Sequence, residues 1–163
     1  MCRRMLALAA ASVALVGCGT GTGAERERIS AVVRRFYVAF ANGDGAEMCK
    51  LVSEHQRQRL AGEEVPGAPR GRGSASCPER VRMLHDAVLR EYPAAAHEGD
   101  PLAELRRATV AVVSLTDLNA VARVRFPAGY ASDVPLAKTA AAWVISGEAR
   151  CVPSARAVCH PSL

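Results

Sequence analysis

A cysteine near the amino terminus stands in a context that predicts covalent chemistry. Leu15-Val16-Gly17-Cys18 places a branched aliphatic residue three positions before the cysteine and a small residue directly before it. This is the pattern of a lipobox, in which a peptidase cuts before the cysteine and the thiol carries diacylglycerol. The sequence therefore predicts lipid attachment at Cys18.

The residues before Cys18 have the organisation of a signal peptide. Arg3 and Arg4 make a short positive region, and residues 5–16 form an apolar run. That run is too short for a bilayer span, which needs about 20 apolar residues. Residues 1–17 are thus expected to be a lipoprotein signal peptide, and the glycine-rich residues 18–24 a flexible tether. Two alternatives stay open: an ordinary secretory signal with Cys18 incidental, and an uncleaved anchor.

Four further cysteines, Cys49, Cys77, Cys151 and Cys159, follow the signal peptide. An even number in an oxidising compartment suggests two disulfides, for which three pairings are possible. We favour Cys49 with Cys77, which would close a glycine-rich loop, and Cys151 with Cys159, which would tie the tail. A metal site or redox pair is the alternative, but there is no Cys-x-x-Cys, and His160 is the one histidine close to a cysteine. The sequence predicts no metal and no cofactor.

Charge argues against a nucleic-acid partner. The formal net charge is +5, and removal of Arg3 and Arg4 with the signal peptide leaves +3. Nucleic-acid-binding domains normally carry clustered Lys and Arg and a larger imbalance.

The domain is expected to span residues 25–163. Hydrophobic spacing predicts helices in its first part. Apolar residues recur at helical spacing from Ile29 to Phe40, and Asn42-Gly43 supplies a stop. Shorter helical pieces are expected from Asp44 to Leu51 and from Ser53 to Leu60. A loop without periodicity covers residues 62–74. A further helix is expected after the capping box Ser76-Cys77-Pro78-Glu79, ending before Pro93.

Short β-branched runs follow Pro101 and predict strands. The expected strands are residues 107–115, 120–127, and 134–146 with a break near Thr139. Helices followed by an antiparallel meander are typical of an α+β domain whose helices cover one face of a curved sheet.

The pattern resembles the nuclear transport factor 2-like (NTF2-like) superfamily, in particular small actinobacterial lipoproteins. The resemblance lies in residues 29–44, in Met48-Cys49-Lys50-Leu51-Val52, and in Ala141-Ala142-Trp143-Val144-Ile145-Ser146; Cys151 with Cys159 resembles the family's closed tail. It implies a cone of three N-terminal helices against a curved antiparallel sheet, with a pocket between them, and a possible homodimer. Such folds host enzymes, ligand binders and interaction modules alike.

Catalytic groups of the resembling enzymes are not matched here. Where isomerases of this superfamily hold a pocket tyrosine, this chain has Phe36, with Tyr37 about 100° away around the helix. The position of their carboxylate base falls near Leu60. Dehydratase-like relatives use a His and Asp pair, yet the sequence places no partner beside His55, His85, His97 or His160.

Four aromatic residues are candidates for a pocket lining: Phe36, Tyr37, Phe40 and Trp143. Plain core is the alternative for each of them. The expected function is a membrane-anchored extracytoplasmic lipoprotein that binds an envelope protein or a small apolar ligand without catalysis. A small isomerase or dehydratase using the same pocket is the alternative.

Overall fold

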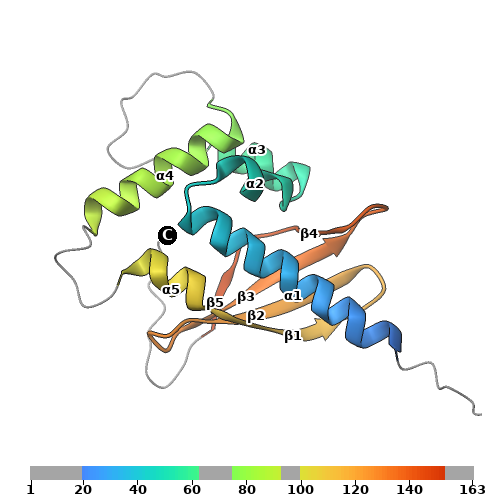
Figure 1. Cartoon of the computed structure of the whole chain (residues 1–163). Helices are drawn as coiled ribbons and strands as arrows, with labels where there is room; N and C mark the ends of the chain where they lie inside the picture. The colour runs from blue at the N-terminus through green and yellow to red at the C-terminus, as the bar shows by residue number, and fades with distance from the viewer. Residues whose placement is uncertain (1–19, 63–74, 93–99, 153–163) are drawn as a thin grey trace, which may run out of the picture.

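The computed structural model describes residues 20–62, 75–92 and 100–152 of the chain. Within them, helices cover one face of an antiparallel sheet, with α1 lying across that face (Figure 1), so the α+β class is confirmed. No helix in these three ranges is both long and apolar enough to cross a bilayer. The predicted signal peptide, Cys18, Cys159 and all but the first residue of the loop at 62–74 lie outside the described residues.

The first helix is longer than its apolar spacing predicts. α1 spans Thr20–Ala41 and ends where expected, because Gly43 adopts a left-handed φ of 68°. Its beginning differs: residues 20–24, expected to be tether, are helical. Arg26 donates to the Val112 carbonyl oxygen at 2.7 Å, which holds the early turns on the sheet. Extending an existing helix needs no new nucleation, and this offsets the poor helix propensity of glycine.

Three further helices begin at the predicted caps. α2 spans Gly45–Lys50, and the Asp44 carboxylate accepts from the Glu47 N–H at 2.9 Å. α3 spans Glu54–Gly62 after Ser53, whose hydroxyl oxygen accepts from the Gln56 N–H. α4 spans Cys77–Glu91, and the Ser76 N–H donates to the Glu79 carboxylate at 2.9 Å. Each cap satisfies a backbone or side-chain group that would otherwise lack a partner.

A fifth helix, α5, was not predicted: the hydrophobic spacing indicated four helical segments, and the resemblance implied three N-terminal helices. It spans Pro101–Arg107, directly before the predicted strand at residues 107–115, where no helix was predicted. Asp100 caps it by accepting from the Leu102 N–H at 2.9 Å, and Pro101 fits the first turn. The Asp-Pro pair was the available signal, but a seven-residue helix shows too few apolar repeats for its period to be recognised.

The sheet is an antiparallel meander in which two short strands, β4 and β5, share the last edge. β1 (Thr109–Leu115), β2 (Asn119–Arg125) and β3 (Ala131–Lys138) are antiparallel neighbours. β4 (Trp143–Ile145) and β5 (Arg150–Val152) pair with successive parts of β3, at Leu136–Lys138 and Ala131–Asp133 respectively. The predicted break near Thr139 is confirmed by a turn in which the Thr139 N–H donates to the Ala142 carbonyl. β5 was not predicted, because three residues carry no measurable alternation.

Two apolar clusters lie under the helices. The larger one, here called the sheet core, joins α1 to the inner face of the sheet; its fully buried members include Ile29, Val33, Val124, Val134 and Leu136. In β2 the inner face is formed by Ala120, Ala122 and Val124, so Val121 lies on the outer face.

The smaller cluster, here called the disulfide cluster, consists of Ala39, Met48, Cys49, Cys77 and Val81. The Cys49 and Cys77 sulfurs are bonded, with 6.2 Å between the Cα atoms. This confirms the predicted pairing of these two cysteines. α2 and α4 approach closely there: a Cβ added at Gly45 would lie 2.3 Å from the Pro78 carbonyl oxygen. Cys151 is also disulfide-bonded, while its predicted partner Cys159 lies outside the described residues.

Candidate functional site

A pocket of about 580 Å³ lies between α1, α3 and the end of β4. Its apolar lining comes from Phe36 of α1, Val52, Leu60 of α3 and Ile145 of β4. The strand end is fixed against the start of α3, because Ser53 donates to the Ile145 carbonyl at 2.8 Å and Ile145 donates to the Leu51 carbonyl at 2.9 Å. These two backbone bonds hold the apolar walls of the pocket together.

Polar side chains line the other part of the same pocket. Gln56 is 8% exposed, and its Nε2 donates to the Ser146 carbonyl oxygen at 3.4 Å. Arg59 forms an ion pair with Glu148. Both of these charged side chains are more than half exposed, so the pair contributes little to stability and lies at the rim. Sequence reasoning did not find Gln56, Arg59 or Glu148, since a mixed polar helix gives no sign of which side chains face a cavity.

The four aromatic candidates do not gather around this pocket. Phe36 lines it, but Phe40 packs beside the disulfide cluster, with its ring centroid 6.3 Å from that of His85. Tyr37 packs edge-on against Phe126, with ring centroids 5.6 Å apart. Trp143 is buried in the sheet core. Of the four candidates, Phe36 alone is in the described lining, and Tyr37 contacts its ring edge-on with ring centroids 5.4 Å apart.

Tyr37 belongs to an aromatic group that also contains Phe126 and Tyr130. Phe126 stacks on Tyr130 with ring centroids 4.4 Å apart, and Tyr37 packs edge-on against Phe126. Burial raises the pKa of the Tyr37 hydroxyl. Burial, and then the nearby Glu104 carboxylate, raise the pKa of Tyr130. Both phenols are consequently protonated at neutral pH and can act as hydrogen-bond donors, not as bases.

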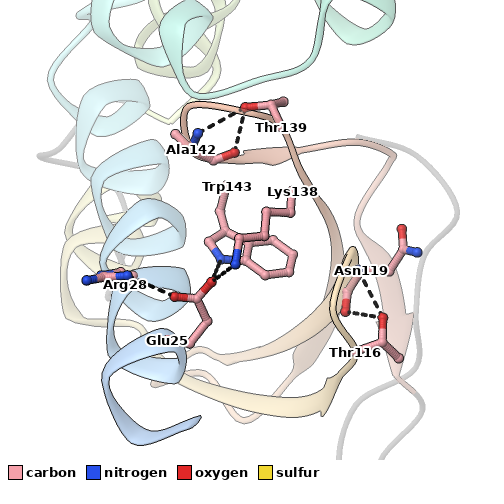
Figure 2. A network of polar contacts seen from close by, with 8 residues as sticks. All are labelled: Glu25, Arg28, Thr116, Asn119, Lys138, Thr139, Ala142 and Trp143. Atoms are coloured by element: carbon pink, nitrogen blue, oxygen red, sulfur yellow. Dashed lines mark hydrogen bonds and ion pairs between the residues drawn. The ribbon is translucent and has the colours of Figure 1, made fainter. Parts of the chain in front are cut away.

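Trp143 takes part in a polar network that the sequence did not predict. Its Nε1 donates to the Glu25 carboxylate at 2.7 Å, and Lys138 Nζ lies 2.6 Å from the same oxygen (Figure 2). Arg28 contacts the other carboxylate oxygen at 3.1 Å. These hydrogen bonds, that of Lys138 first and that of Trp143 second, lower the pKa of Glu25 to about 2. We call Glu25, Lys138 and Trp143 the Glu25 network; it fastens the start of α1 to the turn between β3 and β4.

The histidines give no support to a catalytic pair in the pocket. His55 is exposed on α3. His85 Nδ1 lies 3.3 Å from the neighbouring Asp86 carboxylate, but this pair is on α4 and is not part of the pocket lining. His97 and His160 lie outside the described residues. Among residues that the structure describes, no group of three or more His, Cys, Asp or Glu side chains could hold a metal ion.

Comparisons of the chain with models of protein families, with curated proteins and with solved structures found no match. The site is thus defined by its own geometry: a pocket with an apolar floor, an amide group in its wall and an ion pair at its rim.

Proposed function

We propose that this chain is a lipoprotein held through Cys18 on the extracytoplasmic face of the cell membrane, and that its pocket binds a small, mainly apolar ligand without catalysis. The observation that carries the first part is Leu15-Val16-Gly17-Cys18 directly after an apolar run too short to span a bilayer. A diacylglycerol group on Cys18 would supply two acyl chains, enough for stable anchoring where one chain gives only marginal binding.

The Cys49–Cys77 disulfide supports an address outside the cytoplasm. Structural disulfides persist in oxidising compartments and are rare where thiols are kept reduced. The bond joins residues 28 positions apart, and its cysteines are buried in the disulfide cluster. A protein that depended on this bond would fold poorly in a reducing cytoplasm, which agrees with export before folding.

The size and lining of the pocket support ligand binding. About 580 Å³ lies within the range of pockets for small molecules, roughly 300–1,000 Å³. Phe36, Val52, Leu60 and Ile145 offer apolar contact, and Gln56 offers an amide that can orient a polar group of the ligand. An NTF2-like cone is the fold we propose for the domain, as an arrangement that creates such a pocket between helices and sheet.

Two residues favour binding over catalysis. The resemblance matches Phe36 to the tyrosine of the isomerases and puts the position of their carboxylate base near Leu60; both side chains line the pocket. Neither can move a proton. Arg59 and Glu148 are the charged groups of the described lining, and they pair with each other at the rim.

The anchor is tested by expressing the full-length gene in a bacterial host with a lipoprotein pathway and measuring intact mass and membrane partition. A mature chain that begins at Cys18 and carries acyl mass is expected. Cys18→Ala should lose both the acyl mass and the membrane partition, whereas the matched variant Cys2→Ala should keep both. An unlipidated, soluble wild-type product would overturn the anchor.

The pocket is tested by fluorescence titration of the purified domain with 1-anilinonaphthalene-8-sulfonate. Gln58 is exposed and lines the pocket, so Gln58→Trp should fill the mouth and weaken binding about tenfold or more. His55→Trp puts the same bulk on an exposed position of α3 outside the lining and should leave binding unchanged. Equal binding by both variants would contradict the assignment of the pocket.

A further inference from the structure

The early beginning of α1 leaves almost no chain between the lipid and the folded domain. This inference rests on lipidation at Cys18. One residue, Gly19, separates that cysteine from Thr20, the first residue of α1. A fully extended chain advances at most about 3.6 Å per residue, so the Cys18 Cα lies within about 7 Å of the start of the helix. Anchoring at Cys18 must therefore bring this end of α1 to the bilayer surface.

Two turns of the sheet lie at the same end of the molecule. They are the turn at residues 116–119 between β1 and β2, and the turn at residues 139–142 between β3 and β4 (Figure 1). The Lys138 N–H donates to the Leu118 carbonyl at 2.8 Å, which holds one turn beside the other. The Glu25 network then ties the second turn to α1 (Figure 2). The start of α1 and both turns thus form one connected end.

Each of the two turns carries exposed apolar side chains next to polar ones such as Asp117 and Thr139. Leu118 is 65% exposed, more than Val38, Leu89, Tyr92 or Val113, the other exposed large hydrophobic residues that the structure describes. Ala140, Ala141 and Ala142 are exposed in the neighbouring turn. The first turn is closed by Thr116, whose hydroxyl accepts from the Asn119 N–H at 3.0 Å. The Leu118 side chain has no part in that bond, so the local fold does not require a leucine there.

The charges at this end balance. The basic side chains are Arg26, Arg28 and Lys138, and the acidic ones are Glu25, Glu27 and Asp117. A surface without excess positive charge gains little from anionic lipid head groups, which attract polybasic segments. Contact between this end and a bilayer would therefore depend on its apolar tips and not on lipid charge.

We propose that Leu118 and residues 140–142 form a membrane-facing tip, which enters the lipid interface beside the acylated Cys18 and fixes the orientation of the domain. A lipid anchor on a long flexible tether would let the domain rotate freely. Only one residue separates the lipidated cysteine from α1, and α1 is connected to both turns. The position of the lipid therefore determines the position of the tip relative to the bilayer. The partner of this surface is the bilayer itself.

The test uses the full-length lipidated protein in phosphatidylcholine vesicles, labelled on a single introduced cysteine with an environment-sensitive fluorophore. Leu118→Cys is the probe position, and Leu89→Cys, on the exposed side of α4, is the matched control. We expect lipids carrying a head-group nitroxide to quench the label at 118 at least threefold more than the label at 89. The difference should persist in high salt. Equal quenching at the two positions would overturn the tip.

Intact mass separates this inference from the proposed anchor. If the protein carries diacylglycerol and both labels are quenched equally, the anchor stands and the tip is refuted. If the mass shows no acyl group, the anchor fails and the tip falls with it. A second variant, Leu118→Ser with the label at Ala141→Cys, should reduce quenching at residue 141 while membrane partition stays complete, because the acyl chains suffice to hold the protein.

Discussion

The sheet core and the disulfide cluster are stabilised by different means. The sheet core is large and aliphatic, and Ile29, Val33 and Leu136 are each at most 1% exposed. The disulfide cluster is small, with an alanine, a methionine and a valine around its two cysteines. Burial of apolar surface is roughly proportional to area, so a small cluster gains less from it. The comparison indicates that the disulfide supplies stability where the helices bury too little apolar surface to be held by burial alone.

The largest effect is expected from opening the sheet core. Ile29→Ala removes a fully buried side chain between α1 and the sheet, and such truncations cost about 2–5 kcal/mol. Urea unfolding should show a lower midpoint with an unchanged slope. Leu89→Ala, at a position 47% exposed, should change the unfolding free energy by less than about 0.5 kcal/mol. A cost below about 1 kcal/mol for Ile29→Ala would mean that α1 is not held by burial.

A loss of similar size is expected from removing the covalent bond. The Cys49→Ala/Cys77→Ala double variant frees a loop of 28 residues, and the loop-entropy relation gives about 3.6 kcal/mol. Reduction of the wild type also breaks the disulfide of Cys151, so it should lower the free energy of unfolding by at least as much as the double variant does. If the double variant is as stable as the oxidised wild type, burial alone suffices for the disulfide cluster and the contrast between the two clusters disappears.

A moderate effect is expected at the cap of α2, which carries Cys49 into its cluster. Asp44→Ala removes the acceptor of the Glu47 N–H, and loss of such a cap costs about 1 kcal/mol. Asp44→Asn keeps an acceptor and should recover most of the loss, as measured by thermal unfolding. Equal stability of the alanine and asparagine variants would show that the hydrogen bond does not matter.

An effect that depends on pH is expected at the Glu25 network. The pKa of Glu25 falls from 4.5 to about 2 on folding, so the unfolded chain binds this proton first as pH falls. The stabilising contribution is complete above pH 4.5 and is lost progressively between pH 4.5 and about 2. Glu25→Gln should therefore flatten the pH dependence of the unfolding free energy in this range. Glu27→Gln, on the exposed side of the same helix, is the control; identical acid profiles for Glu25→Gln and wild type would refute the assignment.

Local signals predicted where the capped helices begin. They did not predict the full extent of α1 or the contacts between distant residues. Asp44, Ser53 and Ser76 begin helices as expected, because a cap is decided by a few neighbouring residues. The Cys49–Cys77 pair was also predicted, since it closes one loop between two recognisable helices.

Other features depended on contacts between distant residues. Residues 20–24 are helical because the early turns of α1 are held on the sheet, and Glu25 meets Trp143 at a sequence separation of 118. No pattern along the chain encodes either contact. A buried tryptophan usually finds a partner for its N–H, which was a usable hint that Trp143 had one. The pocket side of α3 could not be predicted either, because Gln56, Gln58 and Arg59 look alike in a polar helix.

The Cys49–Cys77 bond also decides what happens to a cut chain. A protease that breaks any peptide bond between the two cysteines leaves two fragments that are still covalently joined. On a protein anchored at Cys18, the fragment with the sheet would stay at the cell surface after cleavage. It would be released when a reductant opened the bond. On a denaturing gel, a cleaved molecule would therefore run as one band without reductant and as two bands with it.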